Sequence, residues 1–149
     1  VKDLITAIEN FLNWNNEHKA IVVGAGNLGS ALLGYQGFKN HGLHFVAAFD
    51  IDETIINKSI HDIPIFHIYT LQSFIKSYPD VAIAVLAVPP FAAQSCAELL
   101  EKAGIKSIWN FTTVRLKVSG DITVQNEDLL SGYALLSACM RTRKENHQK

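Results

Sequence analysis

The chain has few of the features that mark secreted, metal-binding or nucleic-acid-binding proteins. It contains two cysteines, four prolines and six scattered histidines in 149 residues, and its formal net charge is −1. Two cysteines outside any C-x-x-C pair build no disulfide framework, and no histidine pair has zinc-site spacing, so we expect no metal. The small net charge excludes a general attraction to nucleic acid or anionic membranes.

Long hydrophobic runs are absent too. The longest, residues 81–88, has the length of a strand and is closed by Pro89 and Pro90. With no recognisable signal peptide either, we expect a soluble, cytoplasmic protein without a membrane segment. Because the chain starts at Val1 and not at a methionine, we also expect it to be a piece of a longer protein.

Apolar residues make up 48% of the chain, enough for one well-packed domain. Strands are expected at 20–23, 44–49, 64–68, 81–88, 106–110 and 122–125, and helices at 4–12, 28–37, 71–78, 91–103 and 128–140. This alternation favours an α/β fold, a doubly wound parallel sheet of the Rossmann type. In such a sheet the loops 24–29, 50–52, 88–90 and 110–113 follow carboxyl strand ends and meet at one edge.

A glycine turn, VVGAGNLGSALL, follows the first expected strand. Gly24, Gly26 and Gly29 have the Gly-x-Gly-x-x-Gly spacing of a dinucleotide site, where they allow a tight turn, close approach of a pyrophosphate and packing of helix on strand. The amides of residues 27–29 then face the anion at a helix N-terminus, beside the side chain of Asn27. The spacing is a weak signal alone, and the flanking strand and helix strengthen it.

An acidic residue closes the next strand. Asp50 lies 21 residues after Gly29, where a carboxylate accepts hydrogen bonds from the adenosine ribose. It repels a 2′-phosphate and no arginine adjoins it, so NAD is favoured over NADP. The alternative is an aspartate that only caps the turn. Asp52 and Glu53 are interpreted as ordinary loop acids.

The sequence predicts a binding site without an evident reaction. Hydride transfer needs an element that holds a substrate and an acid or base beside the nicotinamide, whereas the nucleotide fold uses nearly the whole chain. We find no Gly-x-Ser-x-Gly elbow and no Cys/His pair at a strand end, and no catalytic residue is assigned. Two alternatives to a non-enzymatic binding domain stay open. One is a small NAD-dependent oxidoreductase or a fragment of one, and the other is a CoA- or nucleotide-binding module.

Several stretches, in order, resemble the Rex family of bacterial redox-sensing transcriptional repressors. They are VGAGNLGSALLGY (23–35) with Phe38, AAFD (47–50), IPI (63–65), VP (88–89), AGI (103–105), NF (110–111) and DL (128–129). GAGNLG followed by ALxxYxGF is far more specific than the glycines alone. The resemblance extends over most of the chain, from residue 20 to residue 130.

The resemblance implies a protein that binds NADH and NAD⁺, responds to their ratio and forms a homodimer through its last helix, which swaps onto the partner in the family. The matching cofactor-contacting positions are Gly24, Ala25, Gly26, Asn27, Leu28, Gly29, Asp50, Ile51, Val88, Pro89, Asn110 and Phe111. Tyr35 and Asp128 match positions implicated in the family's redox switch, and we group Tyr133 of the last helix with them.

The chain departs from the family in three places. The family's winged-helix DNA-binding domain has no counterpart here, and residues 1–19 match only the connecting helix, so we expect no specific operator binding by this chain. Thr112 and Thr113 stand where Ala-Pro is typical, at the nicotinamide end of the site. Pro90 stands where a small residue is common.

The last helix supports dimerisation independently of the resemblance. Residues 128–140 leave almost no polar face, and a helix that apolar must be buried nearly all round. A partner subunit is the simplest cover, and the alternative is a helix packed wholly against its own sheet. We therefore divide the single domain 1–149 into an N-terminal helix (1–19), a Rossmann core (20–126) and a dimer helix with tail (127–149). Arg141, Arg143 and Lys144 are interpreted as a solvated tail.

A ratio sensor must bind its two ligands with different free energies. NAD⁺ and NADH differ at the nicotinamide, which is cationic in the first and neutral in the second. Val88, Pro89 and Phe111 give that end of the site an apolar lining, in which an unpaired cation is costly. We therefore expect NADH to bind more tightly than NAD⁺.

Overall fold

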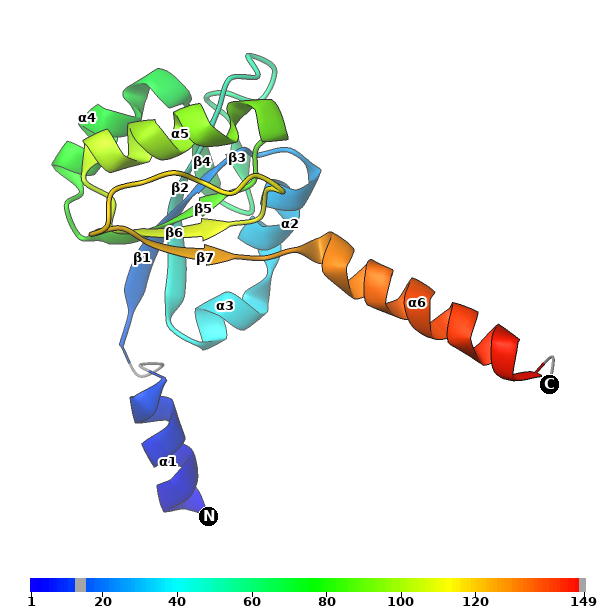
Figure 1. Cartoon of the computed structure of the whole chain (residues 1–149). Helices are drawn as coiled ribbons and strands as arrows, with labels where there is room; N and C mark the ends of the chain where they lie inside the picture. The colour runs from blue at the N-terminus through cyan, green and yellow to red at the C-terminus, as the bar shows by residue number, and fades with distance from the viewer. Residues whose placement is uncertain (13–15, 148–149) are drawn as a thin grey trace.

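The computed structural model describes residues 1–12 and 16–147, in which a central sheet carries helices on both faces (Figure 1). Within these residues, seven strands form one sheet in the order β3-β4-β2-β1-β5-β6-β7. All neighbouring strands pair in parallel except β3 and β4. The strands are β1 (His18–Val23), β2 (Leu43–Asp50), β3 (Ser59–Ile60), β4 (Ile63–His67), β5 (Val81–Leu86), β6 (Ser107–Asn110) and β7 (Thr123–Asn126). The expected doubly wound fold is confirmed.

The helices are α1 (Lys2–Phe11), α2 (Asn27–Gly34), α3 (Gln36–Asn40), α4 (Leu71–Ser77), α5 (Pro90–Ala103) and α6 (Leu129–His147), with a short 3-10 turn, η1 (Ile68–Thr70), before α4. Side chains of β1 alternate between the two faces of the sheet, as the pleat of a strand requires. Ile21 packs with Leu71 and Leu100 on the α4 and α5 side. Val22 packs with Leu33 on the α2 side.

Several elements differ from expectation. The helix expected at 28–37 is divided at Tyr35, whose extended backbone (ψ 106°) separates α2 from α3. The strand expected over 81–88 ends at Leu86. Strand β3, which was not predicted, forms a tight antiparallel hairpin with β4. Its turn residues, His61 and Asp62, both have positive φ (50° and 65°). A strand of two residues is too short to give a recognisable sequence pattern.

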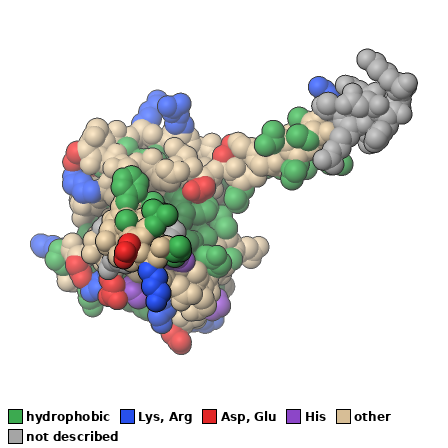
Figure 2. Space-filling view, turned by 90° about the horizontal axis from the view of Figure 1, so that it is seen from below, with side chains coloured by type: hydrophobic (Ala, Val, Ile, Leu, Met, Phe, Trp, Pro, Cys, Tyr) green, Lys and Arg blue, Asp and Glu red, His purple; other side chains and the backbone are tan. Residues whose placement is uncertain are grey.

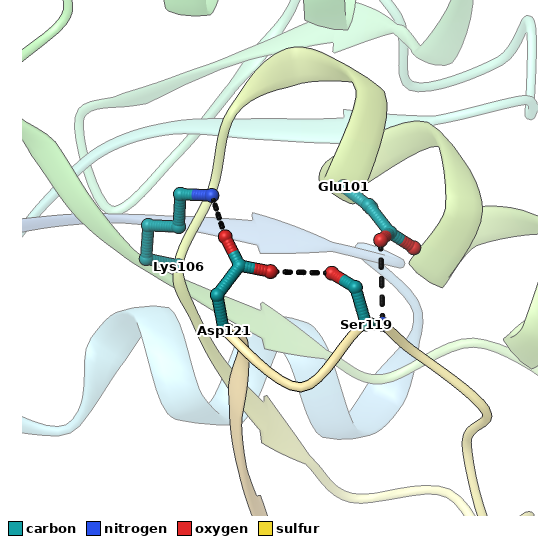
Figure 3. Close-up of polar contacts among 4 residues, drawn as sticks. All are labelled: Glu101, Lys106, Ser119 and Asp121. Atoms are coloured by element: carbon teal, nitrogen blue, oxygen red, sulfur yellow. Dashed lines mark hydrogen bonds and ion pairs between the residues drawn. The ribbon is translucent and has the colours of Figure 1, made fainter.

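The crossover from β6 to β7 contains no helix among its residues 111–122. Gln94 of α5 holds this segment through a reciprocal pair of hydrogen bonds: its Nε2 donates to the Lys117 carbonyl (2.8 Å), and its Oε1 accepts from the Lys117 amide (2.9 Å). Lys106 and Asp121 form an ion pair at the far end, where the Ser119 hydroxyl also donates to Asp121 (Figure 3). These contacts fix where β7 begins.

Helices α1 and α6 project from the body of the molecule (Figure 1). α1 buries none of its residues, although Leu4, Ile5 and Ile8 form the apolar face expected from the sequence. α6 is longer than the expected 128–140 and extends to His147, so the basic cluster interpreted as a tail lies within its backbone. Figure 2 shows apolar side chains exposed along the described part of α6.

Candidate functional site

The three glycines of the turn between β1 and α2 are needed for three different reasons. Gly24 has φ +96°, and a Cβ there would meet the Ala87 carbonyl oxygen at 2.4 Å. A Cβ on Gly29 would lie 1.8 Å from the carbonyl oxygen of Gly24, so α2 could not pack on β1. Gly26 has no atom within 4 Å of its Cβ position. Gly24 and Gly29 therefore serve the fold, and Gly26 leaves space open to a ligand.

Asp50, at the end of β2, fastens this turn. Its Oδ2 accepts a hydrogen bond from the Ala25 amide at 2.7 Å, and its Oδ1 accepts from the amides of Ile51 (2.7 Å) and Asp52 (3.0 Å). The carboxylate thus joins the end of β2 to the glycine turn after β1. Asp52 accepts hydrogen bonds from Thr54, which lower the pKa of the Asp52 carboxyl, and it also lies in the lining of the cavity at this edge of the sheet.

A cavity of about 740 Å³ opens at this edge of the sheet. Its lining contains ten of the twelve residues expected to contact a cofactor: Gly24, Ala25, Gly26, Asn27, Leu28, Asp50, Ile51, Val88, Pro89 and Phe111. The expectation that the carboxyl ends of β1, β2, β5 and β6 meet at one edge is confirmed. The volume falls within the range of small-molecule and cofactor sites.

The remaining two expected residues do not line the cavity. Gly29 lies beneath the turn, against Gly24. Asn110 is fully buried, and its side-chain amide donates to the Val114 carbonyl (2.9 Å) and to Asn126 Oδ1 (2.8 Å). Its Oδ1 accepts from the amide and the hydroxyl of Thr112. Asn110 therefore shapes the loop after β6, and Thr112 belongs to the same hydrogen-bonded unit.

Sequence reasoning missed the contribution of α5 to the cavity. Phe91, Ala92 and Cys96 line it from this helix, and Ile55, Ile60 and Ile68 line it from the segment around β3 and β4. Burial raises the pKa of the Cys96 thiol, with a further contribution from the negative charge of Asp50. The thiol therefore stays protonated and acts as apolar lining. The spacing of Ala92 and Cys96, one helical turn apart after Pro89 and Pro90, was the available signal.

The residues grouped as a switch come from two parts of the chain, the junction of α2 and α3 and the helix α6. Tyr35 is 62% exposed and borders a second hollow with Phe38, His41 and Trp109. Asp128 accepts hydrogen bonds from the Leu130 and Ser131 amides at the start of α6, and the Ser131 hydroxyl also lowers the pKa of the Asp128 carboxyl. Tyr133 is 71% exposed on α6. Among the described residues of one chain, no hydrogen bond or ring contact joins these three side chains to one another.

A membrane-spanning helix and a metal-holding cluster are both absent from the part of the chain that the structure describes. No helix there is both long and apolar enough to cross a membrane. No group of three or more His, Cys, Asp or Glu side chains in residues 1–12 and 16–141 is arranged to hold a metal ion.

The glycine turn, the acidic strand end and the parallel sheet define a nucleotide-binding α/β domain, and comparisons with known proteins refine that class. Residues 15–114 match the CoA binding domain family. The chain is 54% identical, over 97% of its length, to the redox-sensing transcriptional repressor Rex of Treponema denticola and 42% identical, over 91%, to that of Bacteroides thetaiotaomicron. The chain belongs to the Rex family of redox-sensing transcriptional repressors, as the sequence predicts.

Solved structures agree with this assignment. A Rex-family repressor, RSP, superposes with a TM-score of 0.92 in its complex with NADH and 0.91 in its complex with NAD⁺ and operator DNA, at 29% identity over 99% of this chain. The chain covers 71% and 67% of those chains. It spans 68% of the T. denticola relative and 61% of the B. thetaiotaomicron relative.

Proposed function

We propose that this chain is the NAD(H)-binding, redox-sensing domain of a Rex repressor and that it has no catalytic role of its own. The observation that carries the proposal is the glycine turn tied to Asp50 beside an open cavity. The free amides at the start of α2 suit a pyrophosphate, and the unused lone pairs of the Asp50 carboxylate suit ribose hydroxyls. The RSP complexes with NADH and NAD⁺ support the same ligand.

Sheet order gives the direction of the bound dinucleotide. Asp50 follows β2 and the glycine turn follows β1, so the adenosine half lies toward β2 and the nicotinamide half toward β5 and β6. There the cavity is lined by Val88, Pro89 and Phe111, which are apolar. We infer that NADH, with its neutral ring, binds more tightly than NAD⁺. We also infer that ten of the twelve expected positions touch the ligand and that the other two, Gly29 and Asn110, shape the cavity.

Calorimetric titration of the chain with NADH, NAD⁺ and NADPH tests this proposal. We expect micromolar or tighter binding of NADH, weaker binding of NAD⁺ and the weakest binding of NADPH. Lys106→Ala, at the opposite edge of the sheet, is the matched control and is expected to bind NADH as the parent does. Equal affinities for NADH and NAD⁺ would refute the sensing role, and no binding of either would refute the ligand.

CoA is the second candidate, because the family model that matches residues 15–114 is described as a CoA binding domain. CoA carries its additional phosphate on the 3′ oxygen of the ribose, so an acid opposite the 2′ oxygen excludes it only weakly. Competition separates the two ligands: we expect excess CoA to leave NADH binding unchanged. Displacement of NADH by CoA at similar concentrations would favour CoA.

We further propose that two copies of the chain associate through α6. Leu129, Leu130, Tyr133, Leu135, Leu136 and Met140 are each more than 60% exposed in the single chain. So much apolar surface on one helix is typical of an interface. Sedimentation is expected to show a dimer that Leu136→Glu converts to monomer, while the NADH-binding residues 20–126 stay folded. A monomer in the parent chain would contradict it.

Operator DNA is a proposed partner of the whole repressor and not of residues 1–149 alone. The solved RSP complex contains operator DNA, and RSP extends beyond the part that this chain covers. Anisotropy of a labelled operator is expected to show no sequence-specific binding by this chain. Specific binding would place a DNA-reading surface within residues 1–149.

A further inference from the structure

Trp109 joins three parts of the molecule that are otherwise separate. Its ring lies 5.1 Å, centroid to centroid, from that of Phe111, which lines the large cavity. On another side it lies 5.3 Å from Phe38, whose ring packs edge-on against Tyr35 at 4.9 Å. Its indole Nε1 donates a hydrogen bond to Glu127 Oε1 at 3.1 Å.

Glu127 stands at the root of α6. Its amide donates to the Asn110 carbonyl at 2.8 Å, and the next residue, Asp128, caps the helix. Because α6 stands clear of the body (Figure 1), its direction depends on these few contacts just before its first residue, Leu129. A helix of 19 residues is about 28 Å long, so a rotation of about 10° at the root moves its far end by about 5 Å. A small displacement beside the cavity is thereby enlarged along the surface that is proposed to pair with a second copy.

Resting on the function proposed above, we propose that Trp109 is a positioning residue that transmits the redox state of the bound nicotinamide to the root of α6. The cationic and neutral rings place different demands on the Phe111 side of the cavity. A shift of the Phe111 ring changes the position of the Trp109 indole. The indole in turn holds Glu127 through one directional hydrogen bond. Tyr35 is drawn into the same aromatic contact through Phe38.

Packing is the ordinary alternative, because Trp109 also belongs to the apolar cluster around Val22 and Leu33. The two roles differ in what they need from Glu127. A purely packed indole has no use for the Glu127 carboxylate, whereas a positioning indole loses its effect on α6 when that acceptor is removed.

Hydrogen exchange of the backbone amides of residues 127–134, measured with and without NADH and with NAD⁺, tests the proposal. In the parent chain we expect exchange to differ between the NADH and NAD⁺ complexes. Glu127→Ala is expected to reduce that difference by about fivefold, the effect of one lost hydrogen bond, and Trp109→Phe by a similar factor. The double variant is expected to lose no more than either single one, because both remove the same bond.

Two further variants separate positioning from stability. Glu127→Gln keeps a side-chain oxygen as acceptor and is expected to retain the difference. Gln125→Ala removes a neighbouring side chain of β7 that donates to the adjacent Asn126 carbonyl, and it is expected to behave as the parent does. Trp109 packs in the apolar cluster around Val22 and Leu33 and Glu127 does not, so Glu127→Ala stays informative if Trp109→Phe fails to fold.

Calorimetry on the same samples keeps this inference distinct from the proposed function. If the parent chain binds neither NADH nor NAD⁺, the proposed function fails, and this inference falls with it. If the parent binds both but Glu127→Ala keeps the full difference in exchange, or the parent shows none, only the role of Trp109 is overturned.

Discussion

The amino ends and the carboxyl ends of the strands form two edges of the sheet, here called the amino edge and the carboxyl edge. Different interactions hold the two edges together. At the amino ends, ion pairs join neighbouring strands: Lys19 with Asp80, Lys106 with Asp121, and His44 within 3.8 Å of Glu17. At the carboxyl ends, the residues described here form no ion pair, and backbone amides, the two carboxylates of Asp50 and Asp52 and apolar side chains surround the cavity.

The contacts at the amino edge hold strands together, whereas the groups at the carboxyl edge are able to bind a ligand. The ion pairs are more than half exposed in most of their members, so each contributes little, and salt weakens it further. The carboxyl edge instead keeps groups that a ligand can use, and it is held by the backbone bonds that Asp50 accepts. Changes at the carboxyl edge are therefore expected to alter binding, and changes at the amino edge only stability.

Gly29→Ala should have the largest effect, because it breaks both properties of the carboxyl edge. The new Cβ would lie 1.8 Å from the Gly24 carbonyl oxygen, and separating α2 from β1 costs about 1–3 kcal/mol of the free energy of unfolding. We expect a lower Tm and loss of NADH binding, measured by thermal unfolding and calorimetry.

Gly26→Ala is its matched partner. This residue has φ −69° and open space around its Cβ position, so we expect an unchanged Tm. NADH binding should still weaken by about tenfold or more, because a methyl group occupies the space of the pyrophosphate. Normal NADH affinity in Gly26→Ala would mean that the phosphates do not approach this turn.

Asp50→Ala should have the next largest effect, with NADH and NAD⁺ weakened by the same factor of about 10- to 100-fold, since both share the adenosine ribose. Asp50→Asn retains one acceptor for the Ala25 amide and separates the ribose contact from the fastening of the turn. Glu53→Ala, in the same loop, is the control. An unequal loss of the two ligands in calorimetry would place Asp50 beside the nicotinamide instead.

The carboxyl edge was the more predictable of the two from sequence. Its glycines and Asp50 are fixed by backbone geometry at set distances along the chain, so ten of the twelve expected residues line one cavity. Asn110 does not line the cavity, because its side chain bonds Thr112 and Asn126, and a sequence pattern alone does not separate a ligand contact from a loop support at a strand end. The amino edge was not predicted, because Lys106 and Asp121 meet only once β6 and β7 are paired.

The apolar composition of α6, which is visible in the sequence, predicts that a second surface covers this helix. Its apolar composition required cover, and the single chain does not supply it, since Leu129 and Leu136 remain about two-thirds exposed. The alternative of a helix packed wholly on its own sheet is wrong for the described structure of one chain. Which surface covers α6 is a property of an assembly and is not encoded in the pattern of one helix.

Asp121→Asn should have the smallest effect and tests the amino edge alone. The hydrogen bond from Lys106, followed by that from Ser119, lowers the pKa of Asp121 to about 2 from its usual 3.8. Because the folded-state pKa lies below the unfolded one, the stabilisation is fully present above about pH 4 and is lost as the pH falls toward 2. The parent chain should therefore have a slightly higher Tm than the variant at pH 6, with the gap closing by pH 2. NADH affinity at neutral pH should be equal in the two proteins. A gap in Tm that is independent of pH would remove the ion pair as its cause, and a change in NADH affinity would show that the two edges are coupled through the strands between them.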